Sequence, residues 1–503
     1  MSLFNNIIKT RNMKNYRFII KLSLIASLVL PTINSCSDAD FLDMKPLGVA
    51  TEGDLAAGGF EELAFGLYGK IRTQEGIADW TRYWFQSIRS DDAAKGSSST
   101  DAPIWGPVMD NFQYTPNEFA AYWNGHYSLI YACNDLVVAV ESSGTTEQGS
   151  IVNAAEAKAI RAFAYFDLRR DYGEVPIVLN KIVKPSDGVK AKSTVAEVDA
   201  QIISDLEFAA EHLPLSWPAY PGRATKGFAN SLLAKLYLYQ GDWKKALAKS
   251  QEVINSGQYD LMSSYETLFT KAGNNSRETV FEVQFLVVGT TYYTNNYFES
   301  QGVRGSGVWD LGWGFNVPTT NLINAYEVND PRKGVTILTS GQGDGFGNTL
   351  PASPPLDQLY WNKKAYTLPS ERTAFGVNKN YWENIKLMRY ADVLLIAAEA
   401  ANEDGNSGLA ATYLEQVRKR ARGANNSVLP VRSGGQGIMR IYIKQERRIE
   451  FALEGERFYD LVRWGDASAV LGGRGYQTKH QYYPIPQTAI DQSGGVLKQN
   501  PNY

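Results

Sequence analysis

The sequence predicts a mainly α-helical protein in which helix pairs form a scaffold and a loop-rich insertion with short strands interrupts it. Apolar residues recur with helical spacing in several segments on both sides of the chain's middle. Between these segments, residues 289–347 hold 11 glycines and lose that spacing. The composition, 44% hydrophobic and 20% charged over 503 residues, is typical of a globular protein and excludes a disordered or collagen-like chain.

The N-terminus, residues 1–35, is predicted to be a signal peptide of the lipoprotein type. Five cations and no acid occur in it, and the apolar run at residues 22–30 follows the last cation. Nine residues are too few to cross a bilayer core, which takes roughly 20 in a helix. A start at Met13 in place of Met1 also fits the usual length of a signal.

Cys36 is the predicted lipid attachment site. The three residues before it, Ile-Asn-Ser, are similar to a bacterial lipobox, in which cleavage exposes the cysteine for acylation. Plain secretion is the alternative. If Cys36 is lipidated, the other cysteine, Cys133, lacks a partner, and its apolar surroundings predict a small buried side chain. Any contact with the membrane would be through the lipid alone.

Helices are predicted in chain order from their apolar stripes and stop signals. The first covers residues 155–172 and ends at Gly173. A helix pair follows at residues 229–257, where Gly241 ends the first helix and Asp242 caps the second. This pair resembles a tetratricopeptide repeat, in which small residues let two helices approach closely.

A second helix pair is predicted at residues 389–422. No fixed period of roughly 34 residues links the two pairs, so the predicted solenoid is degenerate and interrupted. The interruption begins with a short strand at residues 281–285, where apolar and polar side chains alternate. The glycine-rich loops follow, and long loops in compact proteins are usually functional.

Composition and motifs exclude several classes of function. The net charge of −3 argues against a general nucleic-acid binder. Three histidines far apart in the sequence disfavour a histidine metal site, and zinc-protease, serine-hydrolase and C-x-x-C motifs are absent. The glycine run at residues 341–347 lacks the context of a phosphate loop and predicts a flexible loop. We therefore expect no catalytic residue, metal or cofactor, although acidic pairs leave a glycosidase open.

The densest charge cluster is predicted to be a buried structural network, with a catalytic role as the alternative. Glu450 and Glu454 lie one helical turn apart and would repel each other unless arginines neutralise them. The arginines of the same cluster are the expected partners. The predicted network consists of Glu446, Arg447, Glu450, Glu454, Arg457 and Arg463.

Aromatic residues in two loops form the candidate binding site. Tyr and Trp suit half-wet surfaces because they join an apolar body to a polar tip. The early loop contains Trp80, Tyr83 and Trp84 as well as Trp105, and none of the rings in either loop belongs to an evident periodic element. Such rings can stack on sugars, although they can also simply hold the loops on the scaffold. The candidate ligand-binding residues are Trp105, Tyr292, Tyr293, Trp309 and Trp313.

Taken together, the motifs resemble those of the SusD/RagB-like outer-membrane nutrient-binding lipoproteins. Each motif is weak alone, but their order is specific and spans the chain from Cys36 to its last residue. The matching segments after the lipobox are residues 37–43, 155–177, 241–243, 329–332, 389–395, 446–457, 460–464, 484–486 and 499–503.

The resemblance implies a function and a partner. Members of this family capture oligosaccharides at the cell surface and deliver them to a SusC-like TonB-dependent transporter, over which they sit as a lid; the RagB branch is associated with peptides. They are not enzymes. The resemblance also implies lipid anchoring in the outer membrane, facing the exterior. Glycan-binding members use rings from an early loop and a mid-chain loop, and Trp105 and residues 292–313 occupy comparable places.

One domain is expected after the signal, residues 36–503, although length alone favours about three. We divide it into a helical part at residues 36–257, a loop-rich, ligand-facing part at 258–385, and a second helical part at 386–503.

Overall fold

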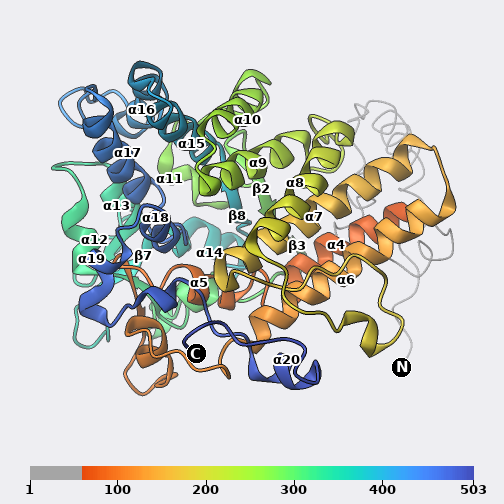
Figure 1. The fold of residues 1–503 in the computed structure, drawn as a ribbon. Coiled ribbons are helices and arrows are strands. Elements are labelled where there is room, and N and C mark those ends of the chain that lie inside the picture. The colour runs from red at the N-terminus through yellow and green to blue at the C-terminus, as the bar shows by residue number, and fades with distance from the viewer. Residues whose placement is uncertain (1–58) are drawn as a thin grey trace, which may run out of the picture. The chain divides into compact units, whose positions relative to one another are not determined.

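Long helices that pack side by side form the scaffold (Figure 1). The computed structural model describes residues 59–503. From α6 to α10 each helix packs against the next one in the chain, and α4 packs against both α6 and α7. These helices are α4 (Phe60–Thr73), α6 (Ala120–Ser143), α7 (Gln148–Tyr172), α8 (Val195–His212), α9 (Lys226–Gln240) and α10 (Trp243–Asn255).

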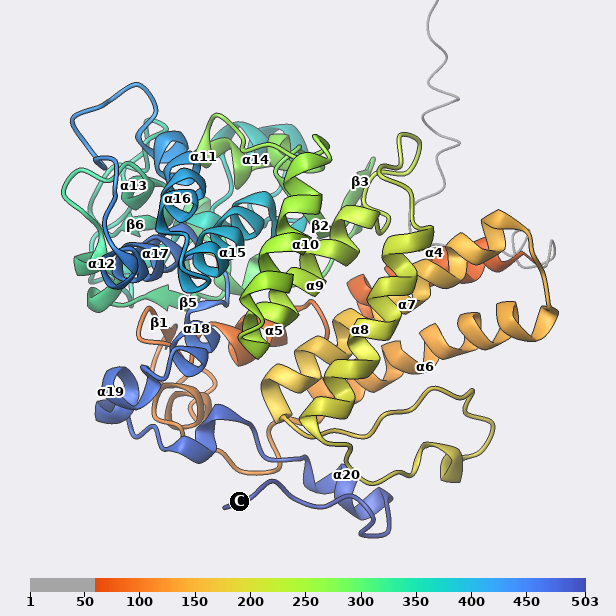
Figure 2. The same cartoon turned by 45° about the horizontal axis from the view of Figure 1, so that its top comes forward.

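The helical stack continues across the insertion (Figure 2). Helix α10 packs directly against α15 (Tyr390–Glu403), although residues 256–389 separate the two helices in the chain. Helix α16 (Ser407–Arg422) packs on α15, and α17 (Gln436–Glu450) packs on both. The predicted fold class, an interrupted helical solenoid, is therefore confirmed.

The pair α9 and α10 ends and begins where its sequence predicts. The hydroxyl of Thr225 accepts the Phe228 N–H at 3.1 Å and caps α9. Gly241 ends α9 with φ of +72°, in the left-handed region that favours glycine. The carboxylate of Asp242 then accepts the Lys245 N–H at 3.2 Å and caps α10.

The described strands form four antiparallel two-stranded ladders, and all but β1 lie in the insertion. The pairing β2–β8 holds the two ends of the insertion together, while β1–β5 connects it to an early segment of the chain. The pairs are β1 (Ala93–Gly96) with β5 (Phe315–Pro318), β2 (Thr279–Val283) with β8 (Ile385–Arg389), β3 (Leu286–Val288) with β4 (Thr291–Tyr293), and β6 (Ile337–Thr339) with β7 (Tyr360–Asn362).

Short helices complete the fold, and the C-terminal segment returns to the first helices. The Tyr483 N–H donates to the Asp171 carbonyl at 2.7 Å, and the Asn500 side chain donates to the Tyr172 carbonyl at 2.9 Å. The short helices are α5 (Trp80–Gln86), α11 (Tyr265–Leu268), α12 (Thr320–Ala325), α13 (Arg332–Thr336), α14 (Pro369–Phe375), α18 (Arg457–Arg463), α19 (Ala467–Leu471) and α20 (Gln487–Gln492).

Predictions about the N-terminal signal, the start at Met1 or Met13 and the acylated Cys36 fall outside the described residues. Within residues 59–503, no helix is both long and apolar enough to span a bilayer, and no group of three metal-ligating side chains occurs. Cys133 is a free, fully buried thiol in α6, as predicted.

The charge cluster is buried, but its predicted pairing is wrong. Arg447 binds Asp392 at 2.9 Å and Asp460 at 3.0 Å, while Arg463 binds Glu399 and Asp460. Arg457 binds Asp91 at 2.8 Å, next to β1. None of these three arginines pairs with Glu450 or Glu454 in the described structure, because they face other elements.

Arginines from distant segments neutralise Glu450 instead. Three arginines donate to the Glu450 carboxylate. Arg389, at the end of β8, does so at 3.0 Å, and Arg332 of α13 does so at 3.2 Å. The third is Arg420 of α16. Burial alone would raise the pKa of Glu450, but these cations outweigh it and hold the pKa well below its ordinary value. Arg389 further binds both carboxylate oxygens of Glu454, at 2.7 and 2.8 Å.

Glu383 gives the fold a testable pH dependence. Its carboxyl is 2% exposed, and burial raises its pKa to about 7 despite Lys386 at 3.8 Å. A glutamate in the unfolded chain titrates at ~4.3, so the contribution of Glu383 to stability is fully present below that pH and is lost as pH rises toward 7. Glu383→Gln should remove this loss, which amounts to about 3 kcal/mol.

Urea unfolding of both proteins at pH 5 and pH 8 measures this effect. The glutamine variant should gain stability relative to the natural chain on going from pH 5 to pH 8. An unchanged difference between the two proteins would show that Glu383 does not titrate in this window.

Candidate functional site

The pairing of β1 with β5 brings the two predicted aromatic loops together. Gly96 lies opposite Phe315 in the ladder, and the Ser97 N–H donates to the Gly314 carbonyl at 2.6 Å. The early loop with Trp105 therefore runs beside the mid-chain loop with Trp313. Two segments about 200 residues apart in sequence thus contribute to one surface.

Trp105 packs on a group of aromatic rings that are largely buried. Its indole packs 5.1 Å from that of Trp84, which is 2% exposed, and 6.4 Å from that of Trp80. Trp84 also packs 5.0 Å from Phe315 of β5, so the rings beneath Trp105 include one from the mid-chain segment. Trp80 and Trp105 are themselves half-buried. Each can present part of a ring to a ligand without moving.

Trp313 is the most exposed ring of the predicted set, at 36%. Its backbone N–H donates to the Glu299 carbonyl at 3.0 Å. The loop closes tightly at this point, because a Cβ added to Gly312 would lie 1.9 Å from the same carbonyl oxygen. Only glycine fits there, and the close approach fixes the backbone that carries Trp313.

Polar side chains of the same two loops pair with one another. Arg304 forms an ion pair with Asp101 and donates to the Ser97 hydroxyl at 2.5 Å, which ties the two loops together. Both charged side chains are more than one-third exposed. Among the described residues, the indole N–H groups of Trp80, Trp105 and Trp313 have no hydrogen-bond partner. We call Trp80, Trp105, Trp313, Asp101 and Arg304 the aromatic surface.

Tyr292 and Tyr293 lie in the adjoining β3–β4 hairpin and are half-buried. The ring of Tyr292 packs 5.3 Å from that of Tyr381, and the Tyr381 hydroxyl donates to the Glu299 carboxylate at 3.0 Å. Since the backbone of Glu299 also holds Trp313, the hairpin is linked to the aromatic surface through this residue. Burial raises the pKa of Tyr381, and the Glu299 carboxylate raises it further.

Trp309 does not belong to this surface, contrary to the prediction. It is only 9% exposed and packs with Trp361, Leu311 and Val317 in the insertion's own apolar core. The short turn Gly307–Trp309 directs the ring inward. A ring in an irregular segment is therefore not necessarily available to a ligand.

The early aromatic residues also correct the sequence interpretation. Trp80, Tyr83 and Trp84 form α5, whose first turn is capped by the Asp79 carboxylate accepting the Thr81 N–H at 3.1 Å. Seven residues are too few for a clear apolar stripe. Tyr83 and Trp84 are core residues, whereas Trp80 is half-buried beside Trp105 and joins the candidate site, which the prediction did not include.

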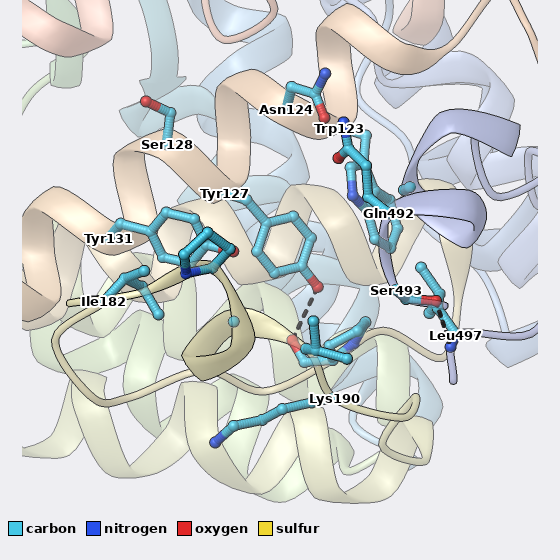
Figure 3. A pocket seen from close by; sticks show the side chains of 15 residues that line it. Trp123, Asn124, Tyr127, Ser128, Tyr131, Ile182, Lys190, Gln492, Ser493 and Leu497 are labelled. Atoms are coloured by element: carbon cyan, nitrogen blue, oxygen red, sulfur yellow. Dashed lines mark hydrogen bonds between the residues drawn. The ribbon is translucent and has the colours of Figure 1, made fainter. Parts of the chain in front are cut away.

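Each carboxylate in the loops that carry these rings already has a side-chain partner. Asp101 pairs with Arg304, Asp310 with Lys379 at 2.7 Å, and Glu299 accepts from Tyr381. The arrangement suits stacking and hydrogen bonding better than proton transfer, because each carboxylate already has a partner. A cavity beside α6, by contrast, shares no residue with the aromatic surface (Figure 3).

Two family models match the chain. Residues 277–481 match the SusD family, and residues 49–238 match the family described as starch-binding associating with outer membrane. Among curated proteins, the chain is similar to SusD-like protein P2 of Formosa agariphila, with 28% identity over 95% of this chain and 98% of that protein. A SusD-like protein of Bacteroides ovatus is 27% identical, over 88% and 82%.

Solved structures agree with this result. A laminarin-binding SusD-like protein superposes with a TM-score of 0.74 and 27% identity, covering 88% of this chain and 99% of that one. Surface glycan-binding protein A of Bacteroides thetaiotaomicron, in complex with laminarihexaose, has a TM-score of 0.73 and 25% identity over the same shares.

Proposed function

Since this chain belongs to the SusD/RagB-like family, we propose that it is a non-enzymatic binding protein that captures oligosaccharides on the aromatic surface. The observation that carries the proposal is the β1–β5 pairing, which brings together two loops that each carry a partly exposed indole and that are joined by the ion pair of Arg304 with Asp101.

The chemistry of a sugar matches this arrangement. The C–H faces of a pyranose ring stack on indoles, because the ring of the tryptophan carries a negative π face. The sugar hydroxyls meet the unpaired indole N–H groups and the exposed ends of Arg304 and Asp101. A few placed polar groups among apolar rings are typical of sites that recognise small polar ligands.

Related proteins suggest the first ligand to test. The two similar solved structures are named for binding laminarin and laminarihexaose. Laminarihexaose is therefore the first probe, and a panel of other polysaccharides follows it.

We further propose that Cys36 anchors the protein in the outer membrane, facing the cell exterior, and that a SusC-like TonB-dependent transporter receives the ligand. One of the two matching family models describes proteins that associate with the outer membrane, which supports this location. A lid above a transporter needs a ligand-facing side of loops, and the aromatic surface is built from loops and short strands.

A binding screen of the soluble mature chain, residues 37–503, tests the proposal. Calorimetry against laminarihexaose, a polysaccharide panel and a set of oligopeptides should give saturable binding to a glycan. Binding to oligopeptides with no response to any glycan would place the protein in the peptide-binding branch. Release of reducing ends from the bound glycan would instead favour a glycosidase.

Cys36→Ala should release the protein from the outer membrane. Stable anchoring takes more than one acyl chain, because each buried CH₂ contributes only ~0.8 kcal/mol, and a lipoprotein cysteine supplies several chains. Membrane fractionation in a strain without the transporter measures the effect, since protein contacts are then removed. A variant that still sediments with the membrane would contradict the proposed anchor.

A further inference from the structure

The cavity beside α6 has a volume of about 590 Å³, within the range of about 300–1,000 Å³ common for small-ligand sites. Three segments enclose it: helix α6, the loop between α7 and α8, and C-terminal residues 489–497 (Figure 3). The cavity takes no part in the function proposed above.

Three aromatic residues form the floor of this cavity. Trp123, Tyr127 and Tyr131 lie one helical turn apart on α6, with ring centroids separated by 4.8 Å and 6.1 Å. The Tyr127 hydroxyl donates to the Pro176 carbonyl at 2.8 Å, which attaches the loop wall to the floor. Helix geometry therefore sets a regular row of rings beside the cavity, in which Trp123 and Tyr127 are each 5% exposed and Tyr131 is half-buried.

Hydrogen-bonding groups in the cavity lack partners. Trp123 is only 5% exposed, yet its indole N–H has no partner among residues 59–503, and neither does the Tyr131 hydroxyl. The exposed amides of Asn124 and Gln492 line the same space and are likewise unpaired within the described chain. None of these atoms is among the fully buried unpaired ones, so each is open to solvent and can form a hydrogen bond with a ligand in the cavity.

The charge of the lining is positive. Lys190 is the only charged residue among those that line the cavity. Lys181 and Lys184, in the same loop, are exposed and form no ion pair in the part of the chain described. The loop between α7 and α8 holds four lysines against two acids, Glu174 and Asp187, whereas the chain as a whole carries a net charge of −3. A cleft with one sign of charge attracts ligands of the opposite sign.

From these observations we propose that the cavity binds a short segment of an acidic glycan, with a carboxylate or sulfate near Lys190 and a sugar face on the half-buried ring of Tyr131. This ring and the neutral amides suit sugar rings and hydroxyls, and the lysine supplies the charge preference. The inference rests on the proposed function only in taking a sugar as the ligand class.

Calorimetry with hexagalacturonate, a sulfated hexasaccharide and neutral laminarihexaose tests the proposal on the mature chain, residues 37–503. Lys190→Glu should weaken binding of an anionic probe about tenfold, and added salt should reduce the difference between the two proteins. Tyr131→Ala should weaken it about fivefold. The matched control is Lys244→Ala, an exposed lysine on α10, which should leave affinity unchanged.

Each outcome decides the proposal. The proposal is supported if an anionic probe binds with an affinity that depends on Lys190 but not on Trp105 or Trp313. Equal affinity of the natural chain and Lys190→Glu overturns it, as does the failure of both anionic probes to bind. Lys190-dependent binding of an anionic probe, together with no response to any glycan at the aromatic surface, would contradict the proposed function while supporting the cavity.

Discussion

Arg389→Ala should lower the free energy of unfolding by about 3–5 kcal/mol, the cost of removing one partner from a buried ion network. Arg389 is 2% exposed and binds three carboxylates, those of Glu278, Glu450 and Glu454. Alanine leaves these acids in the interior with fewer cations. Burial then penalises their charged forms, and part of the network must protonate or open.

The network joins separate parts of the fold, which is why the effect is expected to be global. Arg389 ends β8, Glu278 precedes β2, and Glu450 ends α17. A change at Arg389 therefore loosens the junction between the insertion and the helical scaffold. Urea unfolding followed by circular dichroism measures the loss.

Arg440→Ala is the matched control for this prediction. Arg440 also binds a glutamate, Glu403, but its side chain is 43% exposed. Exposed pairs contribute about 0.2–1 kcal/mol, because water screens them. If Arg389→Ala costs no more than Arg440→Ala, the network does not hold the fold together. Ligand affinity per folded molecule should be unchanged in both variants.

Sequence periodicity predicted α7, the pair α9 and α10, and the pair α15 and α16, because each of them carries its own local signals, whereas α4, α6 and α8 were not predicted. The stripe of α7, the left-handed turn at Gly241 and the cap at Asp242 are all readable within about 20 residues. The buried charges were also recognised from their density in residues 446–463. Their partners were not, because Arg332, Arg389 and Arg420 come from other elements.

The candidate site was only partly predictable for the same reason. Strand β1 has the sequence Ala-Ala-Lys-Gly, which shows no alternation of large apolar and polar side chains, so its pairing with β5 leaves no local signal. Without that pairing, Trp80, Arg304 and Asp101 cannot be assigned to one surface. The burial of the Trp309 ring depends on the insertion's own core, which includes residues distant in the sequence, so local sequence patterns do not predict it.

Replacing both Trp105 and Trp313 by alanine should weaken glycan binding about a hundredfold. Stacking of an aromatic ring on a nucleic-acid base contributes ~1–3 kcal/mol, and we take the lower half of that range for a sugar. Each ring then accounts for about tenfold in affinity. The two indoles come from different loops and do not pack against each other, so their effects should nearly add. Calorimetry with laminarihexaose, or with the best glycan of the screen, measures the loss.

Two controls separate binding from folding in this experiment. Trp243→Ala removes a half-buried indole from α10, outside the aromatic surface, and should leave affinity unchanged. Trp309→Phe should lower the melting temperature through the insertion's core without a comparable loss of affinity. A double variant that melts like the natural chain and binds the glycan equally well would move the site away from these loops. Because Trp313 is held by Gly312 against the Glu299 carbonyl, Gly312→Ala should mimic its loss by displacing the ring.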